Sequence, residues 1–279
     1  MIRVEINGES ATVEAVHRAA TWNYGHYTSM QVRDGAVAGL SLHLRRLSES
    51  SAVLFPAAAP PSGDRVRTLV DHALGDLDDA TVQVTVLPDP ASRAGTDIMV
   101  SVSEPVEDAA RPPLRVRTVQ YERELPELKH LATLGLAYHR LRAREAGFDD
   151  ALLTAPDGSL REGSAWNIAF WDGAEVVWPE GPLLAGITMQ VLRLGLRRLG
   201  VPDTTRRVTR DSLDRMTGAA ATNSHCPAQP IAAIDEMFLP EDQGLTDLLR
   251  RAWQQADWEP IAPTGQGAAR HPYRSRRKP

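Results

Sequence analysis

The spacing of apolar residues in the first hundred positions predicts strands separated by two helices. Alternation with period two, the pattern of a half-buried strand, occurs in five segments, 1–6, 22–33, 36–40, 81–87 and 97–102. Asn7-Gly8 and Asp34-Gly35 are typical hairpin turns between such segments. Apolar residues at helical spacing predict a short helix at 42–47 and a longer amphipathic helix at 64–77. This half of the chain is therefore predicted to be an α/β unit.

The pattern changes at residues 104–113, which are rich in Pro, Ala and acidic residues. A strand at 114–119 and a polar stretch at 120–127 follow, and together they indicate a passage between two units. We expect an N-terminal α/β domain at 1–115, a linker at 116–127, a C-terminal α/β domain at 128–260 and a flexible tail at 261–279.

The C-terminal half begins with a predicted helix at 128–145, which Gly147 ends. We expect Leu131, Leu134, Tyr138 and Leu141 to form the buried face of this helix. Short strands with Asp-Gly turns and further helices follow. The strands are predicted at 151–154, 166–170, 175–178, 219–222 and 230–234, and the helices at 186–199, 211–216 and 245–256.

Composition and charge exclude several classes of protein. No apolar run approaches the roughly 20 residues of a membrane span, and the first eight residues read as a strand and turn rather than a signal peptide. One cysteine, Cys226, excludes an internal disulfide framework and fits a reducing cytoplasm. The net charge of -5 argues against nucleic-acid binding by the whole chain. The basic last six residues are interpreted as a solvated tail.

Lysine is used at one interior position only. Almost all cationic side chains are arginines, and the two lysines are Lys129 and Lys278, of which Lys278 lies in the terminal basic segment. A lysine in partly apolar surroundings can lose its proton and act as a nucleophile, whereas an arginine cannot. Lys129 is therefore a candidate for Schiff-base chemistry; the alternative is an ordinary surface lysine.

Three other features complement this amine. Glu162 stands beside a glycine at the start of a strand, and Gly186-Ile187-Thr188 opens a helix whose free N–H groups favour a phosphate. Arg46 is a cation in the other unit with a geometry suited to phosphate oxygens. An amine, an acid and a phosphate cradle are the groups that pyridoxal 5'-phosphate requires. Each feature alone also has an ordinary structural explanation, a solvated acid, a plain helix start and a surface cation.

The order and spacing of these residues resemble the fold-type IV pyridoxal-phosphate enzymes, the class IV aminotransferases. Glu162 follows Lys129 by 33 positions, similar to the family's spacing of Schiff-base lysine and pyridine-binding glutamate. His43-Leu44-Arg45-Arg46-Leu47 resembles the family's His-x-x-Arg-Leu segment, which makes Arg46 the phosphate ligand and Arg45 a surface residue. Thr222-Asn223-Ser224 is similar to the second phosphate-binding turn, with the asparagine of the aminodeoxychorismate lyase branch.

The resemblance implies a two-domain α/β fold with the cofactor in the cleft between the domains, and a homodimer. It implies cofactor contacts from one set of residues, Arg46, Lys129, Glu162, Asn167, Gly186, Ile187, Thr188, Asn223 and Ser224. Four residues of the 22–33 strand are candidates for the substrate pocket, Tyr24, His26, Tyr27 and Thr28. Tyr27 and His26 could equally be packing residues.

The substrate is less constrained than the cofactor. Val86 stands where D-amino-acid aminotransferases carry a carboxylate-binding arginine, and Leu134 where branched-chain enzymes carry a tyrosine. Carboxylate recognition is therefore expected from backbone donors or from Arg93.

The expected reaction is transamination between an amino acid or amine and a 2-oxo acid, with Lys129 as Schiff-base lysine and general base. One alternative is a lyase of the aminodeoxychorismate type, which eliminates a side chain without an amino acceptor. Another is a non-catalytic binding protein on the same fold. The expected partners are small molecules and a second copy of the chain, with no nucleic acid, no membrane and no metal.

Overall fold

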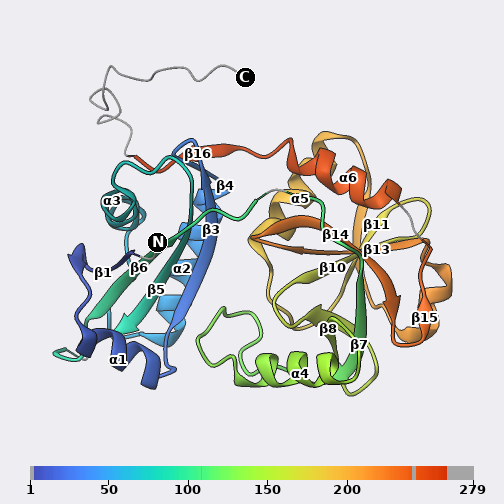
Figure 1. The fold of residues 1–279 in the computed structure, drawn as a ribbon, viewed down its shortest axis with the longest axis horizontal. Coiled ribbons are helices and arrows are strands. Elements are labelled where there is room, and N and C mark those ends of the chain that lie inside the picture. The colour runs from blue at the N-terminus through green and yellow to red at the C-terminus, as the bar shows by residue number, and fades with distance from the viewer. Residues whose placement is uncertain (1–2, 93, 108, 241–242, 263–279) are drawn as a thin grey trace.

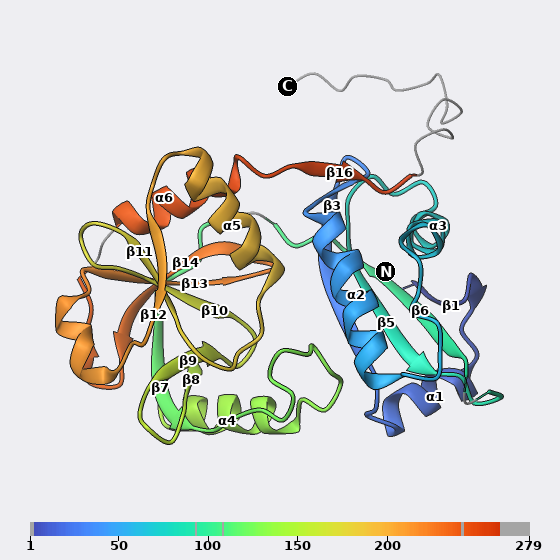
Figure 2. The same cartoon turned by 180° about the vertical axis from the view of Figure 1, so that it is seen from behind.

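Two units, each built on its own sheet, lie side by side in the computed structural model (Figure 1). The structure describes residues 3–92, 94–107, 109–240 and 243–262. Seen from behind, helix α2 (Leu40–Leu54) lies in front of the first sheet, and β16 (Trp258–Pro260) returns to this sheet from the other unit (Figure 2). Within the described ranges no helix has the length and apolar content to cross a membrane. The mixed α/β class predicted from the sequence is confirmed.

The first unit is a seven-stranded sheet with two helices packed on one face. Its strands, in spatial order, are β16, β4 (Ala36–Ala38), β3 (His26–Arg33), β5 (Ala80–Pro88), β6 (Thr96–Ser103), β1 (Arg3–Ile6) and β2 (Glu9–Ser10). Helices α2 and α3 (Gly63–Leu74) share one apolar core with the sheet. Helix α1 (Val13–Thr21), which was not predicted, has no buried residue.

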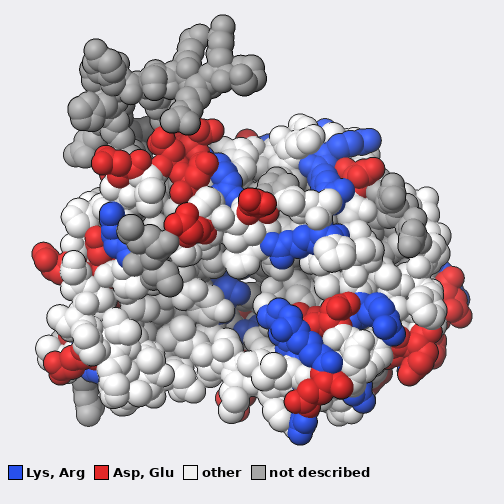
Figure 3. All heavy atoms as spheres, in the orientation of Figure 1, with Lys and Arg blue, Asp and Glu red and all other residues white. Residues whose placement is uncertain are grey.

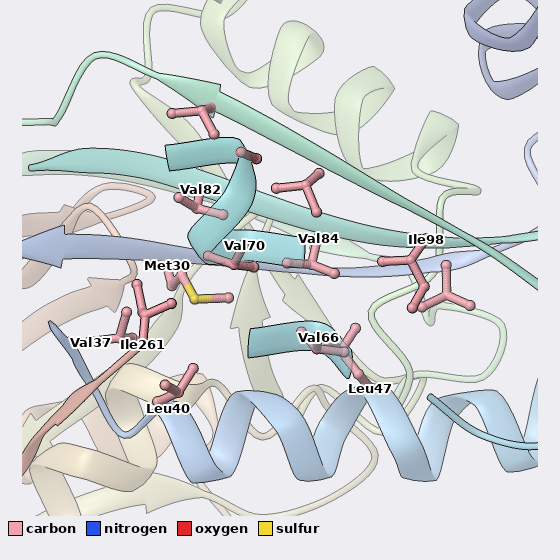
Figure 4. Packing of buried hydrophobic residues seen from close by; sticks show 14 of the residues in the cluster. Met30, Val37, Leu40, Leu47, Val66, Val70, Val82, Val84, Ile98 and Ile261 are labelled. Carbon is pink, nitrogen blue, oxygen red and sulfur yellow. The ribbon is translucent and has the colours of Figure 1, made fainter. Parts of the chain in front are cut away.

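The first core explains why these strands alternate. Val82, Val84 and Val86 of β5 are fully buried because period two sends all three to the face that α2 and α3 cover. Leu47 of α2 and Val70 of α3 point into the same layer (Figure 4). Burying each such side chain contributes roughly 1.5–3 kcal/mol. The opposite face of the sheet is left for the second unit and the site.

The second unit is a sheet closed into a barrel. Its ring runs β10 (Asn167–Trp171), β13 (Gly218–Asn223), β14 (Cys226–Ile234), β7 (Leu114–Gln120), β8 (Asp150–Thr154) and β9 (Leu160–Gly163). Strands β11 (Val176–Pro179), β12 (Asp203–Arg206) and β15 (Met237–Phe238) extend it, and the 3-10 helix η1 spans Arg210–Arg215. The barrel closes where Asn167 of β10 pairs with Glu162 of β9. Closure therefore places two of the predicted site residues side by side.

Two helices that pack on the barrel meet each other at a glycine. Helices α5 (Ile187–Arg198) and α6 (Gln243–Trp253) share the core of Trp178, Leu192 and Leu249. A Cβ placed on Gly195 of α5 would lie 2.0 Å from the carbonyl oxygen of Ala252 in α6. The two helices can approach this closely only because Gly195 has no side chain.

Gly195→Ala is expected to lower the free energy of unfolding by about 1–3 kcal/mol, because the added methyl group must push two backbones apart. Helix propensity alone would change stability in the opposite direction, by about 1 kcal/mol in favour of alanine. Thermal unfolding, followed by circular dichroism, distinguishes the two effects, since the clash lowers the unfolding temperature and the helix propensity raises it. A variant as stable as the wild type or more stable would contradict the contact.

Several predicted boundaries differ from the structure. Residues 116–120, expected in the linker, belong to β7 and pair with β8 and β14. Ile261, expected in the flexible tail, is buried in the first core (Figure 4), whereas 263–279 and Arg93 lie outside the described residues. The helix predicted at 42–47 extends over Leu40–Leu54. The division into domains stays a prediction, since the chain crosses between the units twice.

The predicted helix at 128–145 is corrected in both its start and its buried face. Helix α4 spans Leu134–Glu145, so Lys129 precedes it. Leu134, Tyr138 and Leu141 are 81%, 52% and 57% exposed, although they were expected to be buried. The helix packs through Leu136 and Ala143 instead, and a Cβ on Gly135 would clash with the hydroxyl of Tyr121. Apolar periodicity identified a face of the helix but not the face that packs.

Candidate functional site

A cavity of about 260 Å³ lies between β3 of the first sheet and the barrel. Cationic atoms are visible in the hollow between the two units (Figure 3). Ten of the residues proposed from the sequence line this cavity, Tyr27, Arg46, Lys129, Glu162, Asn167, Gly186, Ile187, Thr188, Asn223 and Ser224. Positions distant in the sequence thus meet at one place, as the motif spacing predicted.

Lys129 is held in an extended segment before α4. Tyr27 N–H donates to the carbonyl oxygen of Lys129 at 2.9 Å, and Leu131 N–H donates to that of Gly25 at 2.9 Å. These bonds tie the segment to the start of β3. The Lys129 Nζ atom lies 4.8 Å from the centre of the Tyr27 ring, a cation–π distance.

The environment of Lys129 makes its amine easier to deprotonate than that of an ordinary lysine. Burial, followed by the positive charges of Arg46 and Arg123, lowers its pKa to about 8, against the opposing effect of Glu162. At pH 7 roughly a tenth of such amines are unprotonated, against roughly one in three thousand for an ordinary lysine. The site therefore raises the supply of nucleophilic amine.

Glu162 is buried in an ion pair. Arg123 donates from Nη1 to Glu162 Oε1 at 3.0 Å, and the Leu184 N–H donates to Oε2 at 3.2 Å. Burial raises the pKa of Glu162, while Arg123 lowers it. The same guanidinium donates to the carbonyl oxygens of Pro126 and Leu128, at 2.9 and 2.7 Å. Arg123 therefore connects the glutamate to the segment that carries Lys129.

The N-terminus of α5 forms a cradle opposite these residues. A Cβ on Gly186 would lie 2.1 Å from Asn167 Oδ1, so only glycine fits there. Asn167 donates from Nδ2 to the carbonyl oxygen of Leu184 at 2.8 Å and thereby holds the loop that enters the helix. Arg46 donates from Nη2 to the carbonyl oxygen of Ala185 at 2.5 Å. Free N–H groups of α5, the Thr188 hydroxyl and the Arg46 guanidinium thus line the same cavity, and such groups favour an anion.

The turn after β13 closes the cavity on another side. Asn223 Oδ1 accepts hydrogen bonds from the N–H groups of His225, at 2.8 Å, and Cys226, at 3.1 Å. The Asn223 side chain is therefore used within the turn. The Thr222 hydroxyl is buried there without a hydrogen-bond partner.

Three of the proposed pocket residues do not line the cavity. His26 and Thr28 lie on the α2 face of β3, where His26 Nε2 shares a hydrogen bond with Ser51 and Thr28 shares one with His43. Tyr24 is directed to α2 and donates to the carbonyl oxygen of Leu54 at 2.7 Å. Successive strand residues face opposite sides, so Tyr27 is accompanied at the cavity by Ser29 instead.

Sequence reasoning also missed residues that complete the site. The described part of the chain has nine buried side-chain polar atoms without a hydrogen-bond partner. Six of them belong to cavity-lining residues, Arg123, His130, Arg140, Ser164, Trp166 and Thr222. Unpaired buried polar groups are rare in folded proteins and cost about 1–3 kcal/mol each, so their gathering here indicates a ligand site. The one signal that could have identified Arg123 is that a buried glutamate needs a counter-ion.

Comparison with known proteins decides the family. The model of the family described as Amino-transferase class IV matches residues 25–234, three quarters of the chain. The chain belongs to the class IV aminotransferase family. Membership makes pyridoxal 5'-phosphate its cofactor, as the sequence predicted.

Individual relatives are more distant. A probable branched-chain-amino-acid aminotransferase of Synechocystis sp. is 26% identical over 116 residues, which are 41% of this chain and 38% of that protein. The branched-chain aminotransferase of the thermophilic archaeon Thermoproteus uzoniensis, solved with norvaline, shares the fold at a TM-score of 0.77 and 20% identity, covering 93% of this chain and 99% of that one. A putative 4-amino-4-deoxychorismate lyase from Legionella pneumophila matches at a TM-score of 0.76 and 17% identity, covering 85% and 92%. The fold-type IV architecture is confirmed.

The cavity of this class IV chain fits the cofactor. Its donor set comprises an amine with lowered pKa, a buried carboxylate and the Gly186 cradle, and these match an aldehyde, a ring nitrogen and a phosphate. His43, beside them, stays neutral because burial, Arg46 and Lys129 lower its pKa to about 3. The chemistry of the donors therefore agrees with the family.

The reactivity of Lys129 should follow its lowered pKa. Without cofactor, its acylation by a small amine-directed reagent is expected to rise with pH and level off above about pH 8, because the neutral amine reacts. Mass spectrometry of the Lys129 peptide measures the rate, with a short lysine peptide as reference. A rate that rises in parallel with that of the reference peptide up to about pH 10, the pKa range of an ordinary lysine, would contradict the lowered pKa.

Proposed function

We propose that the protein is a pyridoxal-phosphate-dependent aminotransferase that moves an amino group between an amino acid or amine and a 2-oxo acid. The observation that carries the proposal is the meeting of Lys129, the Arg123–Glu162 pair and the N-terminus of α5 around one cavity. The bound cofactor would supply an electron sink for the bond-breaking at the substrate carbon.

Each residue has a distinct part in this proposal. Lys129 would hold the cofactor covalently through Nζ and, when free, would carry a proton at the same atom. Glu162 would hold a proton at the ring nitrogen, and Arg123 donates to the carboxylate that does so. Arg46, Thr188 and the N–H groups of α5 would bind the phosphate. Tyr27 lies over the Lys129 amine, where it can orient the amine and exclude water.

A lyase is the second candidate, and one observation favours it. Asn223, which resembles the lyase branch, uses its side chain to shape the turn beside the cavity. Dependence on an acceptor separates the two reactions. A transaminase forms product from an amino donor continuously only when 2-oxoglutarate or pyruvate is present, whereas a lyase needs neither. Product release from aminodeoxychorismate without an acceptor would overturn the aminotransferase proposal.

The predicted homodimer is also retained as a proposal. Leu134 and Leu141 present an exposed apolar stripe on α4, a surface that a second copy could cover. Light scattering after gel filtration is expected to give twice the chain mass for the wild type. The double variant Leu134→Glu/Leu141→Glu is expected to give the mass of one chain. Phe238→Glu, which replaces an exposed apolar residue of β15 by one glutamate, is the control. A monomeric wild type would contradict the dimer. The cytoplasmic location stays a prediction.

A further inference from the structure

The chain returns from the barrel to the first sheet through residues 254–261, which follow α6 and contain β16 (Figure 2). We call them the return segment. Within it, β16 pairs antiparallel with β4, with Trp258 opposite Ala38. Ile261, at its end, is buried in the first core. The return segment therefore joins the two units that enclose the cavity.

On the barrel side the return segment is bound to the end of α5. Arg198, the last residue of α5, donates from Nη1 to Asp257 Oδ1 at 3.1 Å and from Nη2 to Oδ2 at 2.5 Å. The same guanidinium donates to the carbonyl oxygen of Gln255. The Arg198 and Asp257 side chains are 44% and 70% exposed, so the pair adds little stability. Its two-pronged geometry nevertheless fixes the direction in which the segment leaves α5.

On the other side the return segment caps the N-terminus of α2. The residue before this helix is Gly39, which has no side chain to accept a hydrogen bond from the first turn. Glu259 Oε1 accepts instead, from the Ser41 N–H and from the Ser41 hydroxyl, each at 3.0 Å. The carbonyl oxygen of Asp257 accepts from the Gly39 N–H at 3.2 Å. A carboxylate at this position also interacts favourably with the helix dipole.

The glycine that leaves α2 without a cap of its own is required by the contact with α5. Gly39 has a φ of +69°, and a Cβ on it would lie 2.9 Å from Cγ2 of Val191, in the second turn of α5. Serine or aspartate, the usual capping residues, would therefore push the two helices apart. Because α2 and α5 approach so closely, the cap has to come from another part of the chain, and Glu259 supplies it.

The same two helices carry the groups proposed to bind the cofactor phosphate. Arg46 lies on α2 and donates to the carbonyl oxygen of Ala185, just before α5, whose first N–H groups face the cavity. These groups come from different units, so their spacing depends on how α2 is held against α5. The Gly39–Val191 contact and the return segment hold that spacing from outside the cavity.

From these contacts we infer that Glu259 is a positioning residue for the cofactor phosphate, which acts through the first turn of α2 on the placement of Arg46. The inference rests on the proposed function and adds a residue that does not line the cavity. Loss of the Glu259 carboxylate loosens the start of α2 and with it the fit of Arg46 to the phosphate. Lys129 and Glu162, which belong to the other unit, keep their places.

Comparison of pyridoxal 5'-phosphate with pyridoxal isolates the phosphate, since both molecules carry the aldehyde and the ring. Absorbance titration of the full-length, cofactor-free protein gives both dissociation constants. Glu259→Ala is expected to weaken binding of pyridoxal 5'-phosphate about 5-fold, the usual effect of losing a helix cap, and to leave pyridoxal unchanged. Glu259→Gln, which keeps an oxygen acceptor for Ser41, should restore most of the affinity. Glu236→Ala, which removes an exposed carboxylate paired with Arg210 on the barrel, should change neither constant.

The outcomes separate this inference from a general structural role and from the proposed function. The Glu259 side chain is 28% exposed, so its replacement should leave the fold intact. A Glu259→Ala variant that loses affinity for both aldehydes by the same factor, or for neither, would overturn the inference. A wild-type protein whose absorbance changes with neither aldehyde would overturn the proposed function, and this inference with it.

Discussion

Lys129→Ala is expected to abolish covalent attachment of the cofactor and to lower turnover by about 10³-fold or more. The variant loses both the amine that holds the cofactor and the group that moves the proton, and general acid–base catalysis alone contributes about 10²–10⁴-fold. The measurements are the visible absorbance of the protein after dialysis and the rate of amino transfer.

The control is Lys278→Ala, the change at the other lysine of the chain, which should behave as the wild type. Thermal unfolding of both variants checks that neither has lost its fold. An unchanged absorbance spectrum in Lys129→Ala would show that another group holds the cofactor.

Arg123→Met is expected to lower the free energy of unfolding by about 3–5 kcal/mol, because it leaves the buried Glu162 without its counter-ion. The two side chains are only 6% and 8% exposed, so solvent screens their interaction little. The variant also frees the carbonyl oxygens of Pro126 and Leu128, which position Lys129. Denaturant unfolding measures the loss.

Arg117→Met is the matched control, since Arg117 is exposed on β7 and surface substitutions change stability by about 0.5 kcal/mol or less. In both variants the methionine replaces much of the apolar part of the arginine side chain. If Arg123→Met were as stable as Arg117→Met, the pair would contribute nothing to folding.

Many of the residues that line the cavity could be predicted from the sequence because each lies in a short segment with distinctive chemistry. A lone interior lysine, an acid 33 positions later and a Gly-Ile-Thr helix start each follow from short segments. Barrel closure then brings Glu162 and Asn167 together as a strand pair. The α/β class followed in the same way from periodicity, since alternating valines in β5 specify a buried face.

The features that were missed depend on contacts between distant segments. Arg123 stood in a polar stretch that read as a linker, and only the folded chain places it against Glu162. His26 and Thr28 alternate with Tyr27, and no local signal tells which face of β3 meets the cavity. The same holds for α4. Its Gly135 lies against Tyr121, so Leu134 is on an exposed face of the helix, and the sequence alone does not show this.

The most direct test of the central claim is the absorption spectrum of the purified, cofactor-loaded protein, recorded while D- and L-amino acids are added one at a time without an acceptor. The account predicts that the band of the bound aldehyde form gives way to that of the aminated cofactor with at least one donor, and that a 2-oxo acid restores it. A cofactor band that no donor shifts would contradict transamination at Lys129.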